Sequence, residues 1–202
     1  MQNSGEKFFT TKNIVYLAIL TALLIVLNLL GSVFKIVTNV NLTLIPIVLG
    51  ALMLGIKGGI ILGVISGLMT FIFGVTGVDP FTQFLFSQHP VLTFLTCTVK
   101  ITAAGALGGL VYKLISKKNT YVATFVASAV VPVVNTALFI VGALTMYDSI
   151  SALASPDGYG VVYFLVIVCA GVNFLIELAI NVLVAPAIHT TVRVLEKNVF
   201  KR

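Results

Sequence analysis

The sequence is poor in the residues on which soluble catalytic and metal-binding proteins depend. In 202 residues it has no tryptophan, two cysteines, two histidines and six acidic residues. Charged residues make up 9% and hydrophobic residues 59% of the chain, whereas a soluble domain is about a quarter charged and about half apolar. With a mean hydropathy of +1.14, the chain is expected to be an integral membrane protein.

The scarcity of metal ligands and of tryptophan narrows the function further. Cys97 and Cys169 both lie inside apolar segments, where they are expected to pack as small core residues rather than form a disulfide or a metal site. His89 and His189 are expected on opposite sides of the membrane, so no metal site is predicted. The lack of tryptophan argues mildly against a large flat aromatic ligand, although phenylalanine and tyrosine can also stack.

Several catalytic patterns are also missing. The chain has no GxxxxGK[ST] phosphate-binding loop, no second carboxylate near Glu177 for acid–base chemistry, and no nucleophile with a neighbouring base. It is therefore not expected to be an enzyme, to hydrolyse ATP or to need a cofactor. The net charge is +6, but the sequence contains no soluble basic domain that could bind nucleic acid. No nucleic-acid partner is therefore predicted.

The apolar residues divide into six predicted spans of roughly 20 residues that form one membrane domain over residues 1–202. No cleaved signal peptide is expected, because the first apolar segment is long and is followed by five more. The second span is short and contains Pro46, so it is expected to be shielded by its neighbours or to end in a loop inside the membrane. The spans cover residues 13–30, 41–55, 58–74, 91–115, 121–147 and 160–188.

The basic residues predict the orientation of this all-α bundle in the lipid bilayer. Ten of the twelve lysines and arginines fall before the first span, after the last one, in the connections that follow the second and fourth spans, or, for Lys113, at the inner end of the fourth span. By the positive-inside rule, both termini are expected in the cytoplasm. The three outer connections, residues 31–40, 75–90 and 148–159, are longer than the inner ones, which suggests that the outer face is the working face.

Small residues recur four apart on several spans, a spacing that lets helix backbones approach closely in lipid. For Gly59, Gly63 and Gly67 in the third span, and for the small residues of the fourth, packing within this one bundle is the favoured interpretation. Ala18 and Ala22 in the first span are at least as well placed to dock on another polypeptide.

Polar side chains interrupt three of the apolar spans at similar depths. Thr93, Thr96 and Lys100 share one face of the fourth span; Asn135 lies in the fifth. Asn173, Glu177 and Asn181 form a stripe on the sixth. Measured from the outer ends of the spans, Lys100 lies about 14 Å deep, Asn135 and Asn173 about 18 Å, and Glu177 about 24 Å. An unpartnered charge in lipid costs several kcal/mol, so these groups are expected to face inward.

Two interpretations of this polar cluster stay open. Lys100 and Glu177 can form a buried ion pair that only holds two helices together, although such a pair gains little over apolar packing. Alternatively, Lys100, Asn135, Asn173, Glu177 and Thr96 line a substrate cavity that opens outward. Two outer segments are candidate lids: VDPFTQFLFSQHP, with Gln83 and His89, and FKIVTNVNLT, with Asn39.

The chain resembles the substrate-binding S component of an energy-coupling factor (ECF) vitamin transporter over nearly its whole length. The resemblance lies in the six predicted spans, in the AxxxA motif of Ala18 and Ala22, and in four stretches of sequence. These are LIPIVLGALMLGIKGGIILGVISGLMTFIFG, ITAAGALGGLVYKLISKKN, VVPVVNTALF and GVNFLIELAINVLVAPAI.

This resemblance implies a bacterial plasma-membrane protein that binds one micronutrient near its outer face with its last three spans. Ala18 and Ala22 then contact a membrane scaffold subunit driven by two cytoplasmic ATPases, so that only the partners use ATP. The general pattern is closest to members assigned to pantothenate; riboflavin, thiamine, lipoate, niacin or a nucleoside-like compound stay open.

Three other classes remain alternatives to that interpretation. The first is a small stand-alone secondary transporter or channel, which is disfavoured because the sequence shows no repeated halves and no polar file across the whole membrane. A membrane enzyme lacks a catalytic constellation, and a purely structural subunit leaves the buried polar residues without a purpose.

Overall fold

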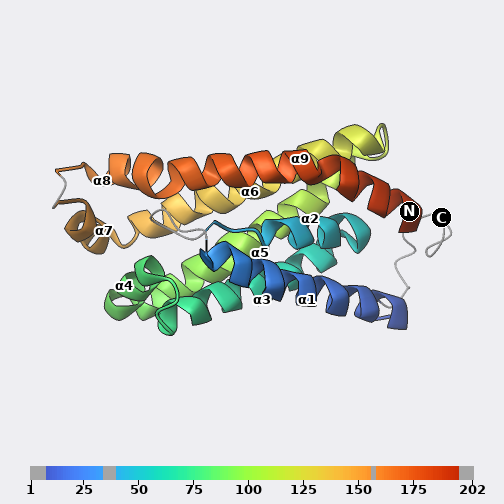
Figure 1. Cartoon of the computed structure of the whole chain (residues 1–202). Helices are drawn as coiled ribbons and strands as arrows, with labels where there is room; N and C mark the ends of the chain where they lie inside the picture. The colour runs from blue at the N-terminus through green and yellow to red at the C-terminus, as the bar shows by residue number, and fades with distance from the viewer. Residues whose placement is uncertain (1–7, 34–39, 156–157, 196–202) are drawn as a thin grey trace.

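The structure, a computed structural model, describes residues 8–33, 40–155 and 158–195, and within these ranges it contains helices and no strand. Five apolar helical stretches in this part of the chain are long enough to cross a membrane, and they run roughly alongside one another (Figure 1). This confirms the all-α membrane class. The stretches are α1 (Thr11–Val33), α3 (Gly55–Val75), α5 (Pro90–Ile115), α6 (Thr120–Leu144) and the continuous α8 (Val161–Tyr163), η2 (Phe164–Gly171) and α9 (Val172–Leu195).

The second predicted span is a ten-residue helix, α2 (Leu44–Met53), shorter than the 15 residues expected. At 1.5 Å per residue it covers about 15 Å, roughly half of a bilayer core. Its neighbours shield it: Leu44, Ile47 and Val48 have no exposed surface. Pro46 lies in the first turn of the helix, where a missing N–H removes no helical hydrogen bond. That the chain has six spans stays a prediction.

Two short helices occupy outer segments that the sequence analysis treated as loops. α4 (Pro80–Gln88) begins with a proline, and α7 (Tyr147–Ala154) follows closely on α6. Both pack one apolar side, Phe81 and Leu85 from α4 and Ile150 from α7, into a second core cluster. They lie at the same end of the bundle (Figure 1).

The tightest helix contact joins α3 and α5 through glycines. A Cβ atom placed on Gly59 would lie 2.3 Å from the Gly105 carbonyl oxygen, and one on Gly105 would lie 2.4 Å from the Gly59 carbonyl oxygen. Gly63 and Gly67 face the backbone of Thr102 and Thr98 in the same way. The expectation that these glycines serve packing within the bundle is confirmed.

Replacing Gly59 with Ala is therefore expected to push α3 and α5 apart and destabilise the fold by about 1–3 kcal/mol, the usual cost of overpacking. The midpoint of thermal unfolding in detergent measures this effect. Gly160→Ala is the matched control, because a Cβ atom there meets nothing within 4 Å. Equal midpoints for the two variants would contradict the close α3–α5 contact.

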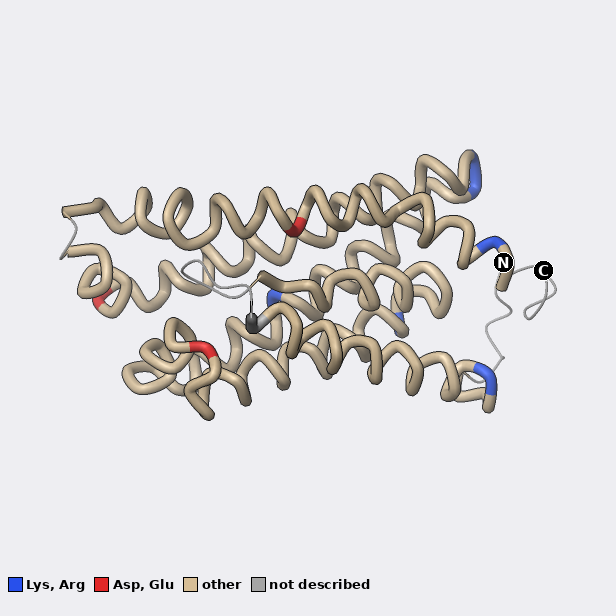
Figure 2. Tube along the Cα trace, in the orientation of Figure 1, with Lys and Arg blue, Asp and Glu red and all other residues tan. Residues whose placement is uncertain are grey.

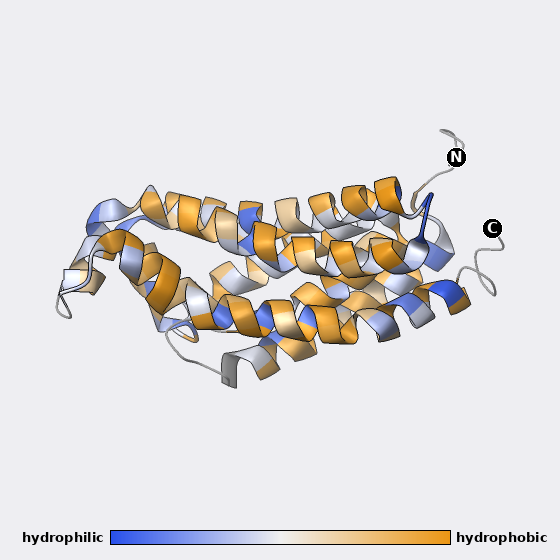
Figure 3. Cartoon of the chain, turned by 90° about the horizontal axis from the view of Figure 1, so that it is seen from above, coloured by the Kyte–Doolittle hydropathy of each residue, from blue (hydrophilic) through white to orange (hydrophobic). Residues whose placement is uncertain are grey.

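Charge and hydropathy are distributed as a membrane protein requires. Most lysines and arginines lie toward the end at which α1 begins and α9 ends, with a further basic position near the middle of the bundle, and acidic residues lie near the middle and toward the opposite end (Figure 2). Apolar residues cover most of the helix surfaces between the two ends (Figure 3). This asymmetry is the pattern behind the predicted cytoplasmic termini, whose orientation stays a prediction.

Candidate functional site

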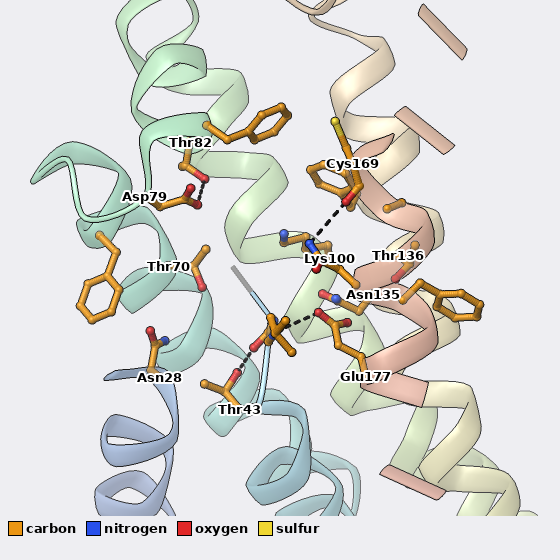
Figure 4. A pocket seen from close by; sticks show the side chains of 18 residues that line it. Asn28, Thr43, Thr70, Asp79, Thr82, Lys100, Asn135, Thr136, Cys169 and Glu177 are labelled. Atoms are coloured by element: carbon orange, nitrogen blue, oxygen red, sulfur yellow. Dashed lines mark hydrogen bonds between the residues drawn. The ribbon is translucent and has the colours of Figure 1, made fainter. Parts of the chain in front are cut away.

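A polar cavity lies in the half of the bundle nearer α4, between helices that are otherwise apolar (Figure 4). Its walls come from α1, the start of α2, α3, α4, α5, α6, η2 and α9. Amides, hydroxyls and charged groups alternate there with four phenylalanines. The lining residues are Asn28, Val40, Asn41, Thr43, Thr70, Phe73, Asp79, Phe81, Thr82, Lys100, Asn135, Thr136, Phe139, Cys169, Ala170, Asn173, Phe174 and Glu177.

Lys100 enters this cavity from the middle of α5. Its ammonium lies 4.9 Å from the centroid of the Phe139 ring on α6, a distance at which the face of the ring attracts a cation. In the described part of the chain, Lys100 forms no salt bridge within 4.0 Å. Its charge is therefore left to interact with whatever fills the cavity.

Glu177 projects from α9 on the opposite wall and is 5% exposed. Its Oε1 accepts a hydrogen bond of 2.9 Å from the backbone N–H of Asn41, and the Asn135 side chain points toward its carboxylate (Figure 4). Lys100 and Glu177 thus line one cavity without joining as an ion pair. This geometry favours the substrate-cavity interpretation over a pair that only holds two helices together.

A short hydrogen-bond network fixes the wall around Asn41. The Thr43 hydroxyl donates to Asn41 Oδ1, and the hydroxyls of Thr43 and Ser66 lie 2.7 Å apart. Because Asn41 also reaches Glu177, the network ties the start of α2 to α3 on one side and to α9 on the other. It holds the Asn41 backbone N–H in place toward the Glu177 carboxylate.

The π-helical segment η2 precedes Asn173 and contributes Cys169 and Ala170 to the cavity. Asn173 Nδ2 donates to the Cys169 carbonyl oxygen over 3.4 Å. π-helical turns are rare and recur at functional sites, because they interrupt the regular ladder of backbone bonds. Nothing in the apolar sequence FLVIVCAG signals this change of helix type.

The structure brings together Lys100, Asn135, Asn173 and Glu177, four of the predicted site residues. Thr96 lies outside the main cavity: its side chain packs against Gly142, and it lines a smaller hollow beside Lys100.

Three other predicted site residues are not placed in the cavity. Gln83 is exposed on α4, next to Gly77. His89 is the junction between α4 and α5. Asn39 lies outside the described residues, so its role stays a prediction.

The helical form of α4 explains why Gln83 lies outside the cavity while Asp79 and Thr82 line it. Its inward face carries Phe81, Thr82 and Leu85, which turns Gln83 outward. Asp79 and Thr82 line the cavity but were not among the predicted site residues. The Asp79–Pro80 pair was the sequence signal that a helix begins here, since proline is favoured at the first position of a helix and aspartate just before it.

The cavity is small, with a volume of ≈ 80 Å³. Pockets that enclose small-molecule ligands usually measure roughly 300–1,000 Å³. A ligand larger than a few water molecules therefore requires the walls to move apart. The short helices α4 and α7 lie at the end of the bundle nearest this site (Figure 1).

The sequence model of the family described as "ECF transporter, substrate-specific component" matches residues 12–189. No curated protein matches the chain at a significant level.

Proposed function

The chain belongs to the family of ECF transporter substrate-specific components, and from this premise we propose that it captures a water-soluble vitamin or related micronutrient from outside the cell. The observation that supports this proposal is the polar cavity built by α5, α6 and α9 inside an apolar bundle. Lys100 in that cavity has no ion-pair partner in the described chain. Ionisable groups held at such depth usually mark a transport site.

Pantothenate is the first ligand to test, as the resemblance in the sequence suggests. In this proposal its carboxylate meets the Lys100 ammonium, and its amide and hydroxyl groups meet the amide side chains of Asn135 and Asn173. Riboflavin, thiamine, lipoate, niacin and nucleoside-like compounds are the other candidates, because the cavity offers both phenylalanine rings and polar groups.

In the same proposal the chain works as one subunit of a bacterial plasma-membrane importer. A scaffold subunit contacts α1 at Ala18 and Ala22, and two cytoplasmic ATPases drive the transport cycle. This division of labour agrees with a sequence that lacks a phosphate-binding loop. Both termini then face the cytoplasm, on the side of the ATPases.

We expect the purified chain to bind one compound of a vitamin panel saturably, with a dissociation constant at or below the low micromolar range. Mass spectrometry of small molecules that copurify with the protein identifies the ligand without presupposing it, and isothermal titration then gives the affinity. Saturable binding by no compound at micromolar levels would point to a structural subunit. Uptake by the isolated chain in liposomes, without ATP or partners, would point to a secondary transporter or channel.

A further inference from the structure

Asp79 is an acidic residue of the cavity with an unusual local arrangement. It occupies the position just before α4, where an aspartate side chain normally accepts a hydrogen bond from the first turn of the helix. Here the carboxylate makes no such cap. Its Oδ2 instead accepts a hydrogen bond of 2.5 Å from the Thr82 hydroxyl, and the residue is 6% exposed.

The second carboxylate oxygen, Oδ1, is buried and has no hydrogen-bond partner in the described structure. Leaving a buried carboxylate oxygen unpaired is unfavourable, because the oxygen has lost its hydrogen bonds to water without gaining others. Lys100 does not supply the missing donor, since within the described residues it forms no salt bridge. Figure 4 shows the carboxylate at the wall formed by α4, facing the space that Lys100 enters from α5.

The α6 wall carries a second acceptor of this kind. Asn135 Oδ1 is also buried without a partner, on a side chain that is 4% exposed. Asp79 and Asn135 therefore each present an unfilled acceptor to the cavity, and Lys100 supplies a cationic donor. Groups that complement this set are hydrogen-bond donors at one end of a ligand and an acceptor or anion at the other.

We propose that Asp79 is a ligand-anchoring residue of this site, and that the captured compound is dipolar, with a hydroxyl or N–H group bound to Asp79 and a carboxylate or other acceptor group facing Lys100. This inference rests on the proposed function. It adds a selectivity rule: a compound that keeps the acceptor end but lacks the donor end leaves Asp79 unpaired. Sites built to hydrogen-bond a substrate hydroxyl or N–H reject analogues without it far more strongly than apolar pockets reject a missing methylene.

The test compares Asp79→Asn with Asp148→Asn in the full-length purified chain. Asp148 is the matched control because it also belongs to the α4 and α7 end of the bundle, is exposed, and does not line the cavity. The probes are the water-soluble vitamins of the panel, measured by isothermal titration. Asp79→Asn is expected to weaken binding of the captured vitamin about tenfold or more, and Asp148→Asn to leave it unchanged.

Selectivity separates anchoring from a purely structural role. In pantothenate the donor assigned to Asp79 is a hydroxyl. The matched probe is therefore N-(3,3-dimethylbutanoyl)-β-alanine, which keeps the carboxylate and the amide but lacks both hydroxyls; for another vitamin, it is the corresponding analogue without the donor group. The parent protein should prefer the vitamin strongly, and Asp79→Asn should lose most of that preference. Thr82→Val, which removes only the hydroxyl that holds Oδ2, should reduce the preference less and guards against a misfolded Asp79 variant.

The outcomes are distinct. If Asp79→Asn leaves vitamin binding intact, or leaves the preference for the vitamin unchanged, the anchoring role is overturned. The proposed function is not affected by either result. An equal loss of affinity for vitamin and analogue shows a structural role and also overturns it. Binding of no panel compound to the parent protein overturns the proposed function and this inference with it.

Discussion

Replacing Lys100 with Met is expected to weaken ligand binding about tenfold or more, which corresponds to a loss of about 1.4 kcal/mol or more in binding free energy. Methionine keeps most of the length of the side chain, being one atom shorter, and removes the ammonium that faces the cavity. The fold is expected to persist, because Lys100 forms no salt bridge in the described chain and a thioether also packs well against the Phe139 ring. Isothermal titration with the vitamin identified from the panel measures the change.

Lys57→Met is the matched control for this variant. The Lys57 ammonium also lies near an aromatic ring, 5.7 Å from the centroid of Phe8, but Lys57 does not line the cavity. Its replacement should leave the affinity unchanged. A similar loss of affinity in both variants would mean that the total charge of the protein, rather than the position of Lys100, governs binding.

A double-mutant cycle with Glu177→Gln decides between the two interpretations of the polar cluster. If Lys100 and Glu177 formed a structural ion pair, Lys100→Met alone would lower the thermal midpoint sharply, since breaking a buried pair costs about 3–5 kcal/mol. The double variant would then recover much of that stability, and ligand binding would survive. We expect instead a small change in the midpoint, and losses of affinity in both single variants.

The sequence predicted the parts of the site that lie within apolar runs. Lys100, Asn135 and Glu177 stand out there because lipid offers no hydrogen-bond partner for their side chains. An inward orientation is therefore the only one without a large energetic penalty. The long helices are predictable for the same reason. No comparable penalty applies to polar residues in the outer segments.

That difference explains why the site residues of the outer segments were harder to predict than those of the long helices. Asp79 and Asn41 reach the cavity only because α4 and the start of α2 fold back onto the bundle, which is a tertiary arrangement. Gln83, also polar and in the same segment as Asp79, faces outward. Successive residues of a helix point about 100° apart around its axis. Unless the sequence shows which face of a helix is turned inward, it does not tell which of the polar residues on that helix enter a site.

The first helix is the least buried of the five membrane-length helices in the described chain. Leu20 and Leu24 pack α1 against the core, whereas Ala18 and Ala22 are exposed. Only 17% of the apolar window of α1 is buried inside the bundle. Around the two alanines, the exposed Ile14, Ile19 and Ile25 form a surface that contacts either lipid or another helix. Small residues four apart favour contact with another helix over contact with lipid, because they let the backbone of that helix approach closely.

Replacing both Ala18 and Ala22 with Leu is expected to leave vitamin binding intact and to abolish uptake that depends on the scaffold. The added side chains fill the space that a partner helix would enter, while neither alanine lines the cavity. Titration of the purified variant and uptake by liposomes that contain the complete transporter measure the two effects separately. Ala137→Leu, at an exposed position of α6, is the matched control for adding bulk to a membrane-facing surface. Normal uptake by the α1 variant would assign this face to lipid and move the docking surface to another helix.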